Sequence, residues 1–271
     1  MNHPSPYAAP ELYDLLFEDL DFDIPYWLKV AGEAGGPVLE AACGTGRILL
    51  RLRQAGFDAD GFDGSPAMVE HLRRKAQGYG LDARAEVADM RRFDMGRRYA
   101  RVFCAFNGFA HAETTEGQIQ FLRRAFEHLE PGGAFILHMS YPGPGYWSDP
   151  DGGPYLEREV AGPGGRKIQL WDSRTKDVVG QRQESVMEMR EVGPTGRTTK
   201  VHRFATSQRW VYRFELELLF RAAGFGRWVF HGGFDGRPLS SPDEQIVAWA
   251  FKECAGLEVR KMFDGRPGDS R

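Results

Sequence analysis

Residues 37–47 read Pro-Val-Leu-Glu-Ala-Ala-Cys-Gly-Thr-Gly-Arg, and the interpretation of the whole chain starts from them. The apolar run from Pro37 to Ala42 is bounded by glycines, which predicts a short buried strand. Gly44 and Gly46 allow the backbone to turn sharply and to approach a ligand, because glycine has no Cβ. A helical pattern opens near Arg47, and the free N–H groups at a helix start favour anionic ligands. A strand, a glycine turn and a helix start in this order predict a cradle for a nucleotide or a cofactor.

The spacing of the glycines narrows the choice of cofactor. A dinucleotide fingerprint has a third glycine five residues after the first, and this chain has Leu49 there. The strand also carries an acidic residue, Glu40, four residues ahead of Gly44. The run Leu-Glu-Ala-Ala-Cys-Gly-Thr-Gly-Arg closely resembles the first motif of class I S-adenosylmethionine (SAM)-dependent methyltransferases. The resemblance favours SAM, and the alternatives are a nicotinamide or flavin cofactor or a turn that binds nothing.

Length and composition restrict the class of protein. The chain has 271 residues, 42% hydrophobic and 27% charged, as is ordinary for a soluble globular protein. We find neither an apolar run near the ~20 residues of a membrane span nor a signal peptide. Three scattered cysteines argue for a reducing, cytoplasmic setting and against structural zinc or disulfides. A formal net charge of −3 gives no electrostatic reason to expect nucleic-acid binding. Together with the missing apolar span and the cysteine pattern, this leads us to expect no nucleic-acid, membrane or metal partner.

Two further strands are predicted to end in acidic residues, the first of them at Asp63. Residues 58–63 read as a strand, after which Ser65 is a natural helix N-cap and Pro66 a natural first helical residue. Ligands of an α/β sheet bind beyond the carboxyl ends of its strands, where Asp63 would accept hydrogen bonds from ribose hydroxyls. Residues 61–68 also resemble the second methyltransferase motif.

The second acidic strand end completes the predicted cofactor site. Residues 83–89 read as a strand that ends at Asp89 and is followed by Met90. In the family that the chain resembles, this pair receives the adenine: the carboxylate side takes its amino group and the methionine packs on its ring. Three acidic residues on successive strands, together with the glycine loop, form a specific constellation. The predicted cofactor-binding residues are Tyr13, Glu40, Ala42, Gly44, Gly46, Arg47, Asp63, Gly64, Met68, Asp89, Met90 and Asn107.

The segment before the glycine loop is predicted to be helical. In residues 10–31 the leucines suit one face of a helix, and Pro25 suits the first turn of a second helix. The segment is either an amphipathic cover for the sheet or a lid, whose Tyr13, Tyr26 or Trp27 excludes water from a ligand. It resembles the Tyr-Asp-x-Leu opening of small-molecule methyltransferases. That resemblance implies a helix over the cofactor, with its tyrosine near the methionine end.

The remaining pattern predicts a doubly wound sheet. Thr115 and Gln118 form a candidate capping box for a helix that ends before the Pro-Gly-Gly run at 131–133, and Gly224 suits the end of another. Strands and helices alternate at short spacing, so we expect an α/β, Rossmann-like, mostly parallel sheet of seven strands with helices on both faces. Its last four strands are expected over residues 99–106, 134–141, 225–230 and 245–251.

An antiparallel β insertion is predicted after the fifth strand. Period-two patterning with turns at 162–165 and 193–196 indicates its strands. We expect the insertion to form a substrate wall or a homodimer contact, with candidate substrate residues Tyr26, Tyr141, Tyr155, Trp171 and Trp210. The expected division of one domain is a helical lid at 1–35, an α/β core at 36–141 and 213–253, the insertion at 142–212 and a tail at 256–271.

Taken together, residues 7–253 resemble a class I SAM-dependent methyltransferase, similar in layout to the nucleotide-aminosugar N,N-dimethyltransferases. The shared features are the opening Tyr-Asp, the Ala-Cys-Gly-Thr-Gly loop, the run from Gly96 to Tyr99 and a histidine at the position of His111. The resemblance implies methyl transfer from SAM to an O or N atom of a small molecule, in line and without a metal. The acceptor itself is not implied, because the insertion carries no motif that identifies one.

Methyl transfer from SAM requires few catalytic groups from the protein. A sulfonium methyl is already activated and its leaving group is neutral, so positioning in a dry pocket can suffice. A hydroxyl acceptor benefits from a general base, whereas an amine needs only to be neutral. His111 is the candidate base, with a structural role as the alternative, and His202 and Tyr141 are outside candidates. His138 is expected to pack within the sheet. Two other functions stay open: methylation of a peptide or protein N-terminal amine, and SAM binding without catalysis.

Overall fold

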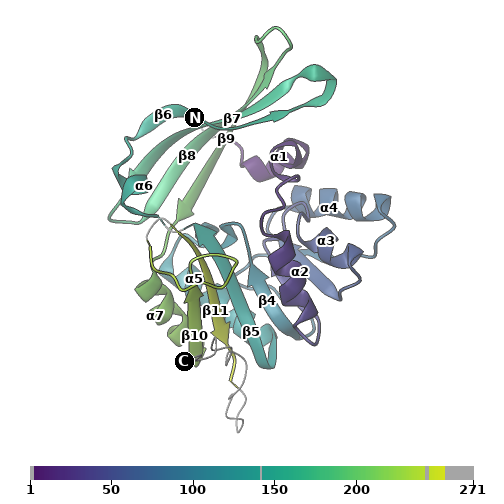
Figure 1. The fold of residues 1–271 in the computed structure, drawn as a ribbon, viewed down its shortest axis with the longest axis vertical. Coiled ribbons are helices and arrows are strands. Elements are labelled where there is room, and N and C mark those ends of the chain that lie inside the picture. Colours follow the sequence, from purple (N-terminus) through teal and green to yellow (C-terminus); the bar gives the residue numbers. More distant parts are fainter. Residues whose placement is uncertain (1–2, 141, 242–243, 254–271) are drawn as a thin grey trace, which may run out of the picture.

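The main sheet has seven strands in the order β10-β11-β5-β4-β1-β2-β3 (Figure 1). The computed structural model describes residues 3–140, 142–241 and 244–253. β11 runs antiparallel to both of its neighbours, and the other six strands share one direction. The predicted mostly parallel, seven-stranded sheet is therefore confirmed. Its strands are β1 (Val38–Ala41), β2 (Ala59–Asp63), β3 (Ala85–Val87), β4 (Tyr99–Cys104), β5 (Leu129–Ser140), β10 (Arg227–His231) and β11 (Gln245–Phe251).

Helices cover both faces of this sheet, as the alternating pattern predicts. One hydrophobic core joins Phe135 of the sheet to α5 (Thr115–His128) and α7 (Arg213–Ala223). A second core on the other face collects the apolar sides of α2 (Ile24–Gly32), α3 (Leu49–Gln54) and α4 (Pro66–Gly78). None of the described helices has the length and apolar character that crossing a bilayer requires.

The ends of the helices follow local chemistry, with one correction. The Ser65 hydroxyl accepts a hydrogen bond from the Met68 amide at the start of α4, and Gly224 ends α7 with a φ of 104°. The predicted capping box of Thr115 and Gln118 is wrong. Thr114 caps α5 instead by accepting from the Gly117 amide at 3.0 Å, while Gln118 is fully buried and accepts from Arg209.

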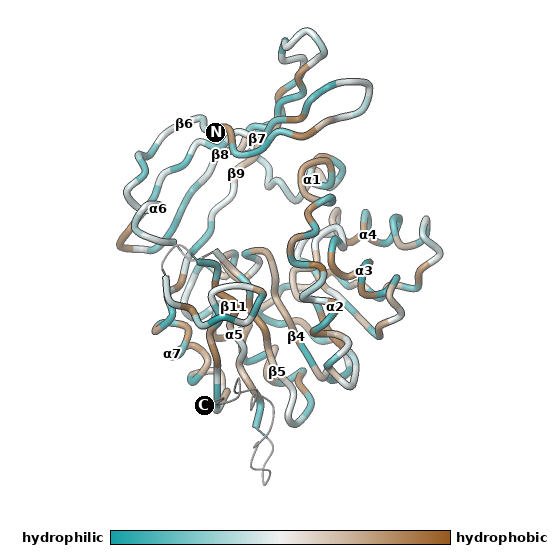
Figure 2. The backbone as a smooth tube through the Cα atoms, viewed as in Figure 1, coloured by the Kyte–Doolittle hydropathy of each residue, from teal (hydrophilic) through white to brown (hydrophobic). Residues whose placement is uncertain are grey.

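A second sheet of four antiparallel strands stands over the carboxyl ends of the main sheet (Figure 1). Short hairpins at 162–166 and 193–197 join its strands, close to the predicted turns. Glu113 accepts from Ser207 at 3.0 Å and pairs with Arg182 at 3.1 Å, which ties the second sheet to the core. Figure 2 shows the second sheet as largely hydrophilic and the main sheet as largely hydrophobic. The second sheet consists of β6 (Gly152–Ala161), β7 (Lys167–Asp177), β8 (Arg182–Val192) and β9 (Thr198–Arg209), preceded by α6 (Pro144–Ser148).

The N-terminal segment lies between the two sheets. It forms η1 (Pro6–Ala8) and α1 (Pro10–Phe17), which confirms the predicted opening helix. On one side, Asp14 pairs with Lys75 of α4 at 2.7 Å. On the other, Leu16 packs with Leu170 and other apolar residues of the second sheet. The predicted tail at 256–271 lies outside the described residues.

Trp27 is a core residue of α2 rather than part of a lid. Its side chain is 1% exposed and stacks on Phe103 of β4 with ring centroids 4.5 Å apart. The indole Nε1 also donates to Asp23 at 3.1 Å, and Asp23 in turn binds Arg47. Trp27 therefore fastens α2 to the sheet.

We expect Trp27→Ala to lower the free energy of unfolding by about 3–5 kcal/mol, because it leaves a large cavity in the core. The melting temperature, measured by calorimetry, should fall by at least about 6 °C. The matched control is Tyr79→Ala, since Tyr79 is 54% exposed and its loss should change stability little. An unchanged melting temperature in Trp27→Ala would contradict this placement.

Candidate active site

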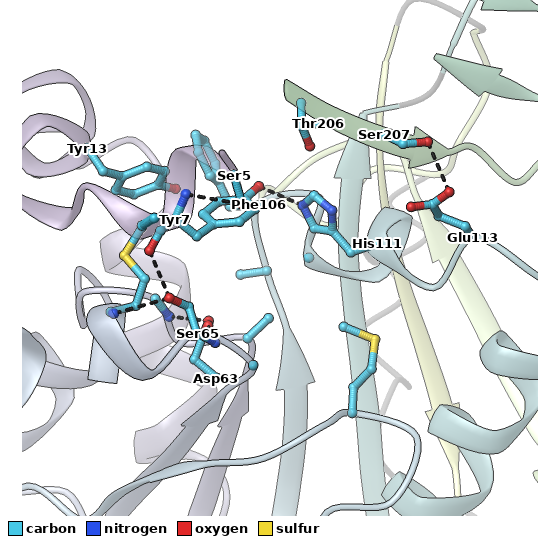
Figure 3. Close-up of a pocket in the computed structure, with 18 of the residues that line it drawn as sticks. Ser5, Tyr7, Tyr13, Asp63, Ser65, Phe106, His111, Glu113, Thr206 and Ser207 are labelled. Atoms are coloured by element: carbon cyan, nitrogen blue, oxygen red, sulfur yellow. Dashed lines mark hydrogen bonds between the residues drawn. The ribbon is translucent and has the colours of Figure 1, made fainter. Parts of the chain in front are cut away.

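Three cavities meet at the carboxyl ends of β1, β2 and β4. The main cavity, of about 560 Å³, lies over the glycine loop and is lined by residues such as Tyr7, Gly44, Asp63 and His111 (Figure 3). The adjoining cavity, of about 710 Å³, shares Met90 and His111 with it and continues to Asp89. The sheet cavity, of about 380 Å³, lies against the second sheet and shares Tyr7, Tyr13, Phe106 and Thr206 with the main cavity.

The glycine loop uses its two glycines differently. Gly44 has a φ of +53°, and a Cβ there would meet no atom within 4 Å, so its backbone faces the open main cavity. Gly46 has a φ of +86°, and a Cβ there would come within 2.8 Å of Leu72. Gly44 thus leaves room for a ligand, whereas Gly46 lets α4 pack closely against the loop.

Asp63 joins the ends of the first two strands. One carboxylate oxygen accepts from the Gly44 amide at 2.9 Å, and the other accepts from the Ser65 amide at 2.8 Å. Desolvation raises the pKa of Asp63, although these two hydrogen bonds oppose the shift. Each carboxylate oxygen retains capacity to accept another hydrogen bond, and Asp63 lines the main cavity.

Glu40 and Arg47, both predicted to bind the cofactor, do not line the three cavities. Glu40 is buried, its Oε2 has no hydrogen-bond partner among the described residues, and desolvation raises its pKa. Arg47 binds the buried Asp23 at 2.8 Å and lies over the ring of Phe106 at 5.2 Å. The two residues therefore lie outside the cavity linings and stabilise the glycine loop indirectly.

The other predicted cofactor residues lie at the cavities. Asp89 lines the adjoining cavity, and its hydrogen bonds with Arg91 hold its pKa at about 2. Asn107, with a φ of +64°, accepts from the Ser140 amide at 2.6 Å and lines the sheet cavity. The main cavity brings together a further set of predicted residues: Tyr13, Ala42, Gly64, Met68 and Met90.

Tyr7 and His111 form a pair at the edge of the main cavity (Figure 3). The Tyr7 hydroxyl lies 2.7 Å from Nε2 of His111, and the two rings meet edge to face at 5.2 Å. Desolvation lowers the pKa of His111, while the charge of Glu113 and a backbone hydrogen bond with Ser207 oppose the shift. His111 is therefore neutral near pH 7. Desolvation also raises the pKa of Tyr7, which keeps its hydroxyl protonated.

The sequence reading missed Tyr7. The contact joins residues 104 positions apart, and no local pattern marks it. The Ser65 hydroxyl donates to the Tyr7 carbonyl oxygen at 2.8 Å, and the Ala205 amide donates to that of Pro4 at 2.9 Å. Residues of the core and of the second sheet thus hold η1 in place from both sides.

The structure does not bring the predicted substrate aromatics into these cavities. Tyr26 lies against Phe234, and its hydroxyl accepts from Trp249 at 2.8 Å. Trp171 lies between Leu170 and Asp172 of β7, which both line the sheet cavity, so its side chain points to the opposite face. Of the others, Trp210 is buried against Tyr146, Tyr155 lies beside Arg174 outside the cavity lining, and Tyr141 is outside the described residues.

His138 lies in β5 beside the end of β4. His138 accepts from the Phe106 amide at 3.1 Å, as expected for a histidine packed in the sheet, and desolvation lowers its pKa to about 4. Within the described ranges, no group of three or more His, Cys, Asp or Glu residues is arranged to hold a metal ion.

The chain is similar to known methyltransferases in sequence and in fold. Residues 38–133 match the family described as "Methyltransferase domain". The chain is 27% identical over 203 residues to dTDP-3-amino-3,4,6-trideoxy-alpha-D-glucopyranose N,N-dimethyltransferase of Streptomyces venezuelae, which covers 74% of this chain and 80% of that protein.

Two solved structures share the fold. The CcbJ methyltransferase from Streptomyces caelestis superposes with a TM-score of 0.72 at 23% identity, over 93% of this chain and 99% of that one. SAM-bound CalS10, an amino pentose methyltransferase from Micromonospora echinaspora, has a TM-score of 0.62 at 22% identity, over 84% of this chain and 91% of that one. The methyltransferase domain matched at residues 38–133, the named relative and this fold together support a class I SAM-dependent methyltransferase of the small-molecule type.

Proposed function

We propose that this methyltransferase holds SAM in the main and adjoining cavities and methylates an amine or hydroxyl of a small molecule bound in the sheet cavity. The observation that carries the proposal is the position of Tyr7, which lines both the main cavity and the sheet cavity and binds His111. The Tyr7–His111 pair, which can accept a proton, thus lies where a cofactor and an acceptor would meet.

The residues present fit SAM. The carboxylate of Asp63 can accept from ribose hydroxyls, and the open space at Gly44 admits a ligand against the backbone. Met90 lines both cofactor cavities beside Asp89, which suits an adenine ring and its amino group. Glu40 would act indirectly, since a backbone hydrogen bond with Leu49 links it to the start of α3. Tyr13 would cover the ligand from α1.

When bound, SAM supplies an activated methyl group on a sulfonium centre. The work left to the protein is to exclude water and to hold the acceptor's lone pair in line. The aromatic rings of Tyr7, Tyr13 and Phe106 line the boundary between the main cavity and the sheet cavity, so they suit this task.

Tyr7 and His111 would remove the proton that the acceptor gives up. His111 also has a backbone hydrogen bond with Ser207, to which the ring would donate, and Nε2 is then left to accept from the Tyr7 hydroxyl. The acceptor's N–H or O–H proton then passes to Tyr7 Oη as the Tyr7 proton moves to His111 Nε2. The pair ends with one added proton, on His111.

The proposal extends to partners and domain organisation. The α/β core at 36–141 and 213–253 would bind the cofactor, and residues 142–212 would bind the acceptor. The named relative favours a small-molecule acceptor over a peptide amine or a non-catalytic role. We propose no nucleic-acid partner, in keeping with a net charge of −3, and a homodimer remains a prediction for sedimentation to test.

With SAM and dTDP-3-amino-3,4,6-trideoxy-glucose, for which the Streptomyces venezuelae relative is named, we expect a product heavier by one or two methyl groups in mass spectrometry. Calorimetry on the same protein should show binding of SAM and of its demethylated product. A folded protein that binds neither ligand would contradict the assignment. If SAM binds but this sugar is not methylated, only this acceptor is excluded.

Asp63→Ala should weaken SAM binding about ten- to a hundredfold, because charge-assisted hydrogen bonds to the ribose are worth roughly 1.5–3 kcal/mol. The measurement is the dissociation constant by calorimetry, with the melting temperature as a check on folding. Asp82→Ala is the control, since Asp82 is an exposed acid outside the three cavities. Unchanged affinity in Asp63→Ala would show that the ribose lies elsewhere.

His111→Gln and Tyr7→Phe should each lower kcat by about 10²-fold if the pair removes the proton. In the wild type, kcat/KM should fall as the pH drops below about 6.5, because protonated His111 cannot accept a proton and its pKa is lowered. The part of this acid limb that comes from His111 should be absent in His111→Gln. His202→Gln is the control, since His202 pairs with Glu191 outside the cavities. If kcat falls less than fivefold at saturating substrate, the pair does not act as a base, and positioning alone accounts for catalysis.

A further inference from the structure

The inner face of the second sheet is divided into an apolar and a polar part. In the apolar part, Ile168, Met189 and Phe204 pack with Leu16 of α1. In the polar part, Gln208 pairs with Gln183 and Thr206 pairs with Ser185 across β8 and β9, and all four line the sheet cavity. Burying polar side chains at inward positions of a sheet costs folding free energy, and such residues usually indicate a function. Packing explains the apolar part but not the polar one.

Asp172 is the buried one among the charged residues that line this cavity. It is 7% exposed, although a carboxylate is almost never buried unless it is paired. Its Oδ2 accepts from the Ser185 hydroxyl at 3.3 Å, and Ser185 also accepts from Gln183 at 2.8 Å. Arg174 is the nearest cation, with Nε 3.4 Å from the same Oδ2. The three buried polar residues Asp172, Gln183 and Ser185 therefore form one connected group.

This group is incompletely satisfied. Oδ1 of Asp172 and Nε of Arg174 are buried, and neither has a hydrogen-bond partner among the described residues. Nη2 of Arg174 is already bound to Glu157, so Arg174 neutralises the charge of Asp172 only in part. Desolvation raises the pKa of Asp172, and the hydrogen bond from Ser185 opposes this shift. A buried carboxylate oxygen without a donor is unfavourable, and a donor from a ligand would relieve that cost.

We propose that Asp172, held by Ser185 and Gln183, is the anchor that selects the methyl acceptor. It would receive a hydroxyl or ammonium group of the acceptor, at a point of that molecule other than the atom that is methylated. The acceptor class is thus a polar molecule with at least two donor-bearing groups, such as a polyhydroxylated amine, and apolar amines are disfavoured. The inference rests on the proposed function, since it assumes that the sheet cavity holds the acceptor.

The residues around the cavity support a second contact point of this kind. The methylated atom must approach Tyr7, which lies at the boundary with the main cavity, whereas Asp172 belongs to the sheet cavity alone. Glu157, Arg158 and Arg174 are the other charged residues of the lining, and they come from β6 and β7. Arg174 is bound to Glu157, and Arg158 is bound to Asp19 at 3.0 Å. Among the described charged residues of the lining, Asp172 is therefore the one with a buried oxygen that lacks a hydrogen-bond partner.

The test measures binding of three probes to the full chain, saturated with the demethylated form of SAM, by ligand-observed NMR. The probes are D-glucosamine, D-glucose and cyclohexylamine. The key variant is Asp172→Asn, which keeps the shape of the side chain but removes its charge. Its control is Glu184→Gln, because Glu184 lies between Gln183 and Ser185 on the exposed face of β8. Melting temperatures and SAM affinity are measured for every variant.

We expect D-glucosamine to bind more tightly than cyclohexylamine and to lose at least about tenfold in affinity in Asp172→Asn. Glu184→Gln should bind like the wild type, and SAM affinity should stay within twofold in both variants. The inference is overturned if cyclohexylamine binds as well as D-glucosamine, if no probe binds, or if Asp172→Asn binds D-glucosamine normally. Failure of the wild type to bind SAM would instead count against the proposed function.

Discussion

The junction of Asp63 and Ser65 holds the candidate site together. Asp63 accepts from the amides of Gly44 and Ser65, and Ser65 caps α4 and donates to the carbonyl of Tyr7. Through Tyr7 the same chain of contacts reaches His111, which follows β4. Asp63 thus links the ends of β1 and β2 with the start of α4, and Ser65 extends the link to the N-terminal segment. The hydrogen bond from Ser65, together with that from the Ala205 amide to Pro4, explains how a short 3-10 turn is held over a cavity.

Backbone strain marks the same edge of the sheet. Ala42 after β1 and the pair Phe106 and Asn107 after β4 have positive φ values, which residues other than glycine seldom adopt. Such conformations persist only where surrounding contacts impose them, and they gather at functional sites. Here the sheet provides those contacts: His138 accepts from the Phe106 amide, and the Ser140 amide donates to Asn107. The two adjacent strands β1 and β4 both turn sharply away, which opens the space between their ends.

The parts of the site that could be predicted from the sequence are those that depend on neighbouring residues. Gly44, Asp63 and Met90 lie at the main cavity because each lies at or just after the end of a strand, where the turn is fixed locally. Tyr7 was not predictable, since its partner is 104 residues away. Trp171 shows a different limit: the period of two in β7 is plain in the sequence, but which of its faces meets the core depends on how the second sheet docks.

The pleat of the second sheet has a consequence for divergence among related enzymes. Inward and outward positions alternate, so Gln183 and Ser185 line the cavity while Glu184 between them faces solvent. A single substitution at an inward position would alter the chemistry of the proposed acceptor site, and it would leave the strand pairing and the main sheet as they were. New acceptor preferences can therefore arise one residue at a time, without any change to the part of the chain that would hold the methyl donor.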